Sequence, residues 1–137
     1  MSVSVNSGAL NGGYLKITLT GGAAVTDGGL GAVLNPEGVD LGITRAWIKG
    51  RTGSTGAANL DAGVGATATT KGTDICSAMD VVEATLNTDL TFLPAVQVAE
   101  TDNPCAIWGA GQYITFTGSA DTTGLDADIY IEYIRLA

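Results

Sequence analysis

The sequence has no histidine in its 137 residues, and only 15% of them are charged. Without histidine it lacks the usual general base, the Ser-His-Asp and Cys-His nucleophile systems, and the commonest metal ligand. Its two cysteines cannot form a structural zinc site alone. These absences predict a protein that is not an enzyme, with no catalytic residues, no metal site and no cofactor.

Basic residues are also scarce. Six Lys and Arg stand against 14 Asp and Glu, which gives a net charge of −8. Nucleic acid and anionic membranes repel such a chain, because binding to phosphates requires a basic surface. No stretch approaches the length of a membrane-spanning apolar helix, and residues 1–8 lack the basic and apolar regions of a secretory signal. We therefore expect no nucleic-acid or membrane partner, and synthesis and folding in the cytosol.

The cysteines, Cys76 and Cys105, lie 29 residues apart. A disulfide between them would stabilise the fold by about 3–4 kcal/mol. Folding in the cytosol keeps thiols reduced, so we expect two small buried thiols instead of a disulfide.

Period-two alternation of apolar and polar residues is the main structural signal. It is clear in six segments, and weaker in three more over residues 23–26, 30–34 and 90–99. Residues 81–87 are the one predicted helix. The clear segments cover residues 14–20, 43–49, 57–64, 73–80, 112–117 and 127–136.

Turn residues separate these segments, which predicts about eight strands in one all-β domain. The natural arrangement is a two-sheet β-sandwich of jelly-roll type over residues 14–137. Residues 1–13 are polar and glycine-rich, so we expect a flexible N-terminal arm before the first strand.

The strand over residues 43–49 carries the main candidate site. Arg45, Trp47 and Lys49 alternate, so a regular strand places them on one face, and Arg51 follows. Tryptophan beside arginine is typical of protein–protein interfaces. Our hypothesis is that this face contacts an acidic neighbour, either another copy or a larger host surface. The alternative is that Trp47 turns inward across a bulge and the charges are simply solvated.

Two other groups of residues are weaker candidates. Asp121, Asp126 and Asp128 offer oxygens for calcium, but their spacing lacks the pattern of a calcium loop, so we expect them to form turns. Four aromatic residues are predicted to fill the core or an interface; the alternative is a platform for stacking sugars. They are Trp108, Tyr113, Tyr130 and Tyr133.

The pattern of strands and loops resembles the small β-sandwich proteins of tailed bacteriophage virions, in particular head decoration (cement) proteins. The resemblance is carried by residues 43–49 with the following Thr/Gly loop and residues 57–64, by residues 73–80, and by the closing unit of residues 111–117 and 128–134. It implies a protein that binds the outer surface of the capsid, often as a trimer, and bridges subunits of the major capsid protein.

Two other functions remain open at this point. One is a glycan-binding module of a phage fibre or spike, which would use Trp108 and the tyrosines for stacking. The other is a self-assembling surface or filament subunit, in which edge strands or the N-terminal arm pair with the next copy.

Overall fold

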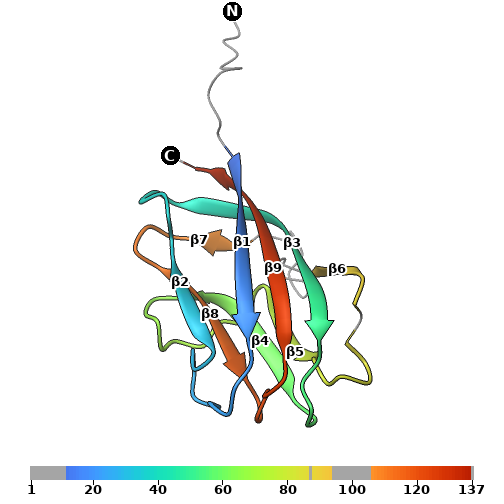
Figure 1. Cartoon of the computed structure of the whole chain (residues 1–137). Coiled ribbons are helices and arrows are strands. Elements are labelled where there is room, and N and C mark those ends of the chain that lie inside the picture. Colours follow the sequence, from blue (N-terminus) through green and yellow to red (C-terminus); the bar gives the residue numbers. More distant parts are fainter. Residues whose placement is uncertain (1–11, 87, 94–105, 137) are drawn as a thin grey trace, which may run out of the picture.

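The computed structural model of the chain describes residues 12–86, 88–93 and 106–136. These residues form nine strands and no helix (Figure 1). The strands are β1 (Gly12–Thr20), β2 (Gly31–Leu34), β3 (Leu41–Thr52), β4 (Asn59–Gly65), β5 (Cys76–Asp80), β6 (Leu90–Leu93), β7 (Ile107–Trp108), β8 (Tyr113–Gly118) and β9 (Asp126–Arg135).

The strands form two antiparallel sheets that face each other. The first has the order β1-β9-β3-β6, with the short β7 paired to β3, and the second has the order β2-β8-β4-β5. In Figure 1 the first sheet lies in front of the second. The predicted all-β, two-sheet sandwich is therefore confirmed, and its jelly-roll connectivity stays a prediction.

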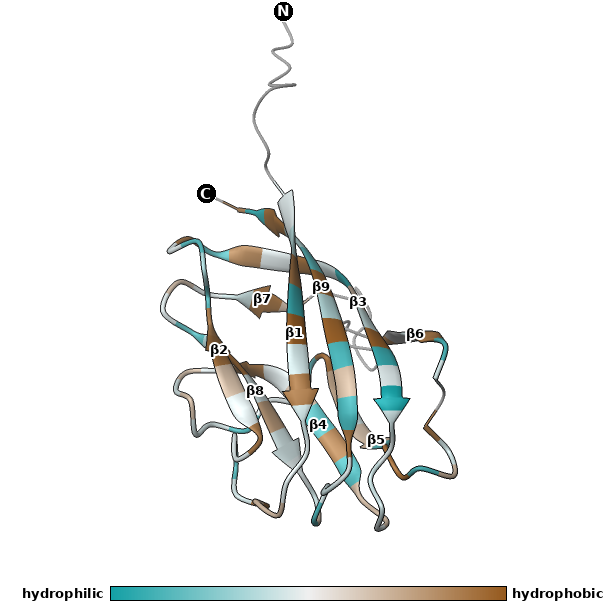
Figure 2. Cartoon of the chain, viewed as in Figure 1, coloured by the Kyte–Doolittle hydropathy of each residue, from teal (hydrophilic) through white to brown (hydrophobic). Residues whose placement is uncertain are grey.

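The core lies between the sheets and consists of alternate side chains of each strand. Figure 2 shows hydrophobic and hydrophilic residues alternating along β9. Ile129 and Ile131 point inward and are fully buried, as the alternation predicted. Burying an aliphatic side chain of this size contributes about 1.5–3 kcal/mol. Other fully buried side chains include Leu41, Ile43, Ile48, Leu60, Ile114 and Phe116.

The helix predicted over residues 81–87 is wrong for the part that is described. A single turn forms there, in which the Leu86 amide donates to the Val82 carbonyl at 2.9 Å. In a helix the Val81 carbonyl would accept a hydrogen bond from the amide four residues later in the chain. That carbonyl instead accepts the Ser54 amide at 2.8 Å, so a tertiary contact stops the helix.

The prediction for β5 also needs correction. Alternation over residues 73–80 places Ile75, Ser77 and Met79 on one side of the strand, but Ile75 is buried and Ser77 is exposed. Cys76, expected on the other side, is buried as well. The strand carries a bulge against β4, and Ala78 within it has a φ of 51°. The bulge shifts the alternation by one residue in the middle of the strand.

Several boundaries differ from those predicted. No strand forms over residues 23–26, and the two-residue β7 was not predicted. β1 begins at Gly12, inside the predicted arm, whose residues 1–11 lie outside the described part of the chain. β3 continues through Arg51 to Thr52, where we predicted a loop. Residues 94–99 of the weak segment also lie outside the described part.

Candidate functional site

The outer face of the β2-β8-β4-β5 sheet is covered by the chain itself. Thr115 and Thr117 point outward from β8, yet both are buried. The Thr115 hydroxyl donates to the Thr70 carbonyl at 2.8 Å and accepts the Gly72 amide at 3.1 Å. The Thr117 hydroxyl accepts the Gly28 amide at 2.9 Å. Two loops therefore close this face: one before β2, and the β4–β5 loop of residues 66–75.

No loop among the described residues covers the outer face of the β1-β9-β3-β6 sheet, which carries a groove of about 440 Å³ that we call the aromatic groove. Tyr14, Trp47 and Tyr130 come from three adjacent strands, and Lys49 and Leu90 complete the lining. The strand register sets this arrangement, because Trp47 lies opposite Tyr130 and Lys49 lies opposite Leu90. A cleft of this volume is large enough for a side chain of a partner or a small ligand.

A second apolar patch lies on the same face beyond the groove. It consists of Ile107, Ile134 and Leu136 around Gly42, and we call it the isoleucine patch. A Cβ atom added to Gly42 would lie 3.4 Å from Ile134 Cγ1 and 3.5 Å from Leu136 Cδ2, so both side chains lie over β3 at this glycine. Five of the seven large hydrophobic residues that are exposed in the described part of the chain lie on this face: Tyr14, Leu90, Ile107, Ile134 and Leu136.

A polar cluster around Glu132 borders the groove on one side. Tyr14 Oη donates to Glu132 Oε2 at 2.7 Å, and Thr44 Oγ1 and Arg45 Nε donate to Oε1 at 2.7 and 2.9 Å. These hydrogen bonds lower the pKa of Glu132 to about 2. Thr44 joins the cluster because it is the extra residue of a bulge in β3. The Arg45 guanidinium lies 5.7 Å from the centroid of the Trp47 ring and supports it.

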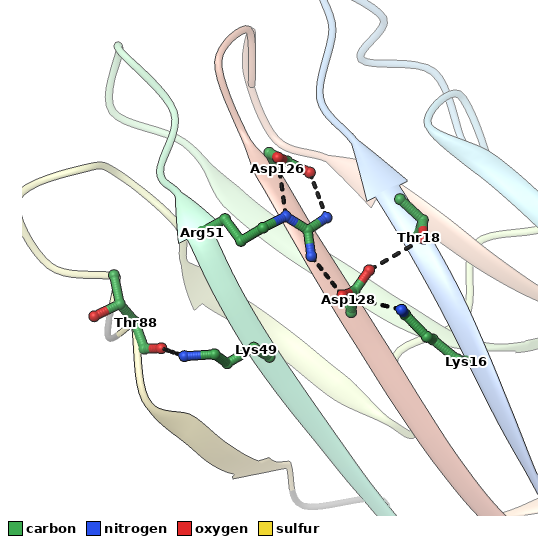
Figure 3. A network of polar contacts seen from close by, with 7 residues as sticks. All are labelled: Lys16, Thr18, Lys49, Arg51, Thr88, Asp126 and Asp128. Atoms are coloured by element: carbon green, nitrogen blue, oxygen red, sulfur yellow. Dashed lines mark hydrogen bonds and ion pairs between the residues drawn. The ribbon is translucent and has the colours of Figure 1, made fainter.

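A second polar cluster borders the groove on the other side (Figure 3). Arg51 binds Asp126 through two hydrogen bonds, of 3.0 and 2.6 Å, and donates a third to Asp128. Asp128 also accepts from Thr18 Oγ1 at 3.1 Å and lies 3.8 Å from Lys16 Nζ. The hydrogen bonds from Arg51 lower the pKa of both aspartates. The cluster connects β1, β9 and β3.

Arg45, Trp47 and Lys49 therefore share one face, as the alternation indicated, and Arg51 at the end of β3 joins them there. Trp47 points outward and is half-buried, so the alternative of an inward Trp47 is wrong. The charges, however, are bound within the chain: Arg45 to Glu132, Arg51 to two aspartates, and Lys49 Nζ to the Thr88 carbonyl (Figure 3). An acidic neighbour would compete with these contacts.

The charge of this face differs from that of the rest of the sequence. The outward side chains of β1, β9 and β3 include four of the six basic residues and three of the 14 acidic ones, a local charge of +1. The rest of the sequence contributes −9 to the total of −8. This face is therefore close to neutral on a strongly acidic protein. The seven residues are Lys16, Arg45, Lys49, Arg51, Asp126, Asp128 and Glu132.

The other candidate residues have structural roles. Trp108 is fully buried and its Nε1 donates to the Gln112 carbonyl at 3.0 Å, so it cannot stack on a sugar. Asp121 accepts the Thr123 amide in a turn, at 2.8 Å. No acidic cluster suited to a metal occurs in the part of the chain that is described.

The structure describes one of the two cysteines. Cys76 is a buried free thiol, and burial raises its pKa to about 12. Cys105 lies outside the described residues.

Sequence reasoning missed most of the groove and the isoleucine patch. Tyr14, Tyr130 and Leu90 lie on three strands other than β3, and only the pairing of those strands brings them to Trp47. The alternation does place Tyr14 with Lys16 on the polar face of β1. That signal becomes informative only once β1 and β3 are known to flank β9.

Comparisons with protein-family models, curated proteins and solved structures gave no match. Within the residues described, none belongs to a helix that is long and apolar enough to cross a membrane.

Proposed function

We propose that this protein is a non-enzymatic decoration protein of a tailed bacteriophage head, located on the outer surface of the virion. Its partner is the major capsid protein, which it binds through the outer face of the β1-β9-β3-β6 sheet. The observation that supports this proposal is the concentration of exposed hydrophobic residues on a sheet face that no described loop covers.

The layout of that face suits a protein partner. Its centre is apolar, with Trp47 and Tyr130 opposite each other, and polar clusters around Glu132 and Arg51 lie on both sides. Protein interfaces concentrate their binding energy in a central aromatic anchor surrounded by polar residues that exclude water. The near-neutral charge of the face also permits close approach to an acidic partner, which the rest of the chain would repel.

We also propose that the strands of this protein are connected as a jelly roll and that copies of the chain associate with one another. Successive strands β1 to β4 alternate between the sheets, and β1 pairs with β9 in one sheet while β2 pairs with β8 in the other. This nesting of antiparallel pairs favours a jelly roll. Several linked copies on one shell would gain avidity without a strong single contact. The resemblance implies a trimer, whereas the free edge of β1 favours a dimer, and the mass of the particle in solution distinguishes the two.

The test uses capsid shells assembled from the major capsid protein of the phage that encodes this chain, without decoration protein. Wild-type protein should co-sediment with the shells at a fixed number of copies and raise their melting temperature. Trp47→Ala should weaken binding about 30-fold, which corresponds to the loss of a central aromatic anchor. Val25→Ala is the matched control, because Val25 is 53% exposed and lies away from this face.

The outcomes separate the function from the site. If wild-type protein ignores the shells, the proposed function is wrong. If it binds but Trp47→Ala binds equally well, the proposed surface is wrong.

Glycan binding is the second candidate, and the aromatic groove is the observation that favours it. Tyr14, Trp47 and Tyr130 provide ring faces at the surface, whereas Trp108 is buried. A sugar-dependent rise in the melting temperature that Trp47→Ala abolishes would support this function instead.

A further inference from the structure

Among the described strands, none lies beside one long edge of β1. β1 pairs with β9 over all nine residues without a register shift, and no other described strand pairs with it. The other sheet edges are shorter or irregular: β2 and β6 have four residues each, and β5 has a bulge at Ala78. Proteins normally protect long, regular edges with prolines, charges or bulges, because such edges pair with other strands. β1 carries one charged residue, Lys16, and no proline.

The hydrogen-bond pattern shows which backbone groups of β1 point to the free edge. Gly21 directly follows β1, and its amide donates to the Leu125 carbonyl at 2.8 Å in the same register as the ladder. In an antiparallel pair, alternate residues exchange hydrogen bonds with the partner strand. Leu15, Ile17 and Leu19 therefore bond to β9. Tyr14, Lys16, Thr18 and Thr20 direct their amides and carbonyls to the free edge.

Apolar side chains along this side of the sandwich are also only partly covered. Leu15 and Ile17 on β1 are half-buried, whereas Ile129 and Ile131 beside them on β9 are fully buried. On the opposite sheet Val33 of the edge strand β2 is likewise half-buried. In Figure 1 β1 and β2 lie on the same side of the molecule. A second chain along β1 would complete the burial of this side.

We propose that β1 pairs antiparallel with β1 of a second copy, around a two-fold axis at Ile17. Only registers that join edge-facing residues form hydrogen bonds, which leaves axes at Leu15, Lys16 or Ile17 for long overlaps of β1. An axis at Leu15 would pair Gly12 with Thr18 and leave Thr20 unpaired, so a glycine would replace a β-favouring threonine in the ladder. An axis at Lys16 would place two ammonium groups opposite each other, which is destabilising. An axis at Ile17 places Lys16 opposite Thr18 of the second copy and Tyr14 opposite Thr20.

Charge complementarity supports the same register. Thr18 Oγ1 bonds to Asp128 Oδ1 at 3.1 Å, so Lys16 of the second copy, opposite Thr18, would lie near that carboxylate. The Lys16 of the same chain is only a loose partner of Asp128, at 3.8 Å. The pair would form one continuous sheet with both aromatic grooves on its outer face. Because an isologous contact is closed, growth stops at two copies.

The inference does not depend on the proposed function, and the full chain without shells is enough to test it. Sedimentation equilibrium should give twice the 13.8 kDa of one chain. Thr18→Pro removes an amide that faces the free edge and leaves the bonds to β9, so it should give a single chain. Thr18→Ala is the matched control: it loses the hydroxyl, keeps the amide and should remain a dimer.

Amide hydrogen exchange provides a second measurement if Thr18→Pro does not fold. In the wild-type protein β9 protects the amides of Leu15 and Ile17 from exchange in both the monomer and the dimer. Those of Lys16 and Thr18 should exchange about tenfold more slowly at concentrations where the dimer forms than after dilution to the monomer. A monomer at all concentrations, a trimer, a polymer, or a dimer with unprotected Lys16 and Thr18 would each overturn the inference.

Discussion

Replacing Gly63 by alanine tests whether the β4–β5 loop closes one face of the sandwich. A Cβ atom added to Gly63 would lie 2.5 Å from the Thr73 amide nitrogen and 2.6 Å from that of Asp74. Both are backbone atoms, so no side-chain rotation relieves the clash and the loop must move away from β4. Overpacking of this kind costs about 1–3 kcal/mol. At about 2 kcal/mol, we expect the melting temperature to fall by about 6–10 °C for a chain of this length.

Gly56→Ala is the matched control. No atom lies within 4 Å of a Cβ added to Gly56, so the same substitution should change stability by less than about 1 kcal/mol. Thermal unfolding followed by circular dichroism compares both variants with the wild-type protein. If Gly63→Ala and Gly56→Ala melt together, the loop does not lie against the sheet. The outer face of the β2-β8-β4-β5 sheet would then not be closed by this loop.

Three other variants test local features of the structure. Ala78→Gly should raise the free energy of unfolding by about 1 kcal/mol, because glycine adopts a φ of 51° without strain; equal or lower stability in urea would contradict this. Hydrogen bonds and Arg45 lower the pKa of Glu132 from 4.5 to about 2, so its stabilising contribution is complete above the unfolded value and is lost as the pH falls. The difference in melting temperature between wild type and Glu132→Gln should therefore be largest above about pH 5 and vanish towards about pH 2, and a constant difference would refute this cause. Acrylamide should quench the fluorescence of half-buried Trp47 and spare that of buried Trp108, so Trp47→Phe should remove the quenchable fraction of the fluorescence. Quenching that persists in Trp47→Phe would contradict the burial of Trp108.

The sequence predicts the strands best where one face is buried and the other is solvated. Leu15, Ile17 and Leu19 on β1 follow the expected alternation for this reason. The prediction fails where tertiary contacts decide the backbone. The bulge at Ala78 and the turn that ends at Leu86 depend on neighbouring segments far away in the sequence. Local periodicity carries no information about such contacts.

In the candidate site, too, local alternation predicts some features and strand pairing decides the others. The alternation on β3 is enough to place Arg45 and Trp47 on one face. Their surroundings depend on register: Glu132 reaches Arg45 and Tyr14 only because β9 lies between β3 and β1. The sequence therefore indicated a cationic surface, and the pairing of strands makes it almost neutral.

The polar cluster around Glu132 points to a final prediction that separates binding from stability. The side chain of Arg45 is 55% exposed, and exposed ion pairs contribute little to folding. Its contact with Trp47 does orient the ring at the edge of the aromatic groove. Arg45→Ala should therefore leave the melting temperature nearly unchanged and weaken binding to capsid shells, whereas Arg45→Lys should bind at an intermediate level because a lysine cannot reproduce the planar contact. A large loss of stability with unchanged binding would show that the cluster holds the sheet together and does not prepare a surface for a partner.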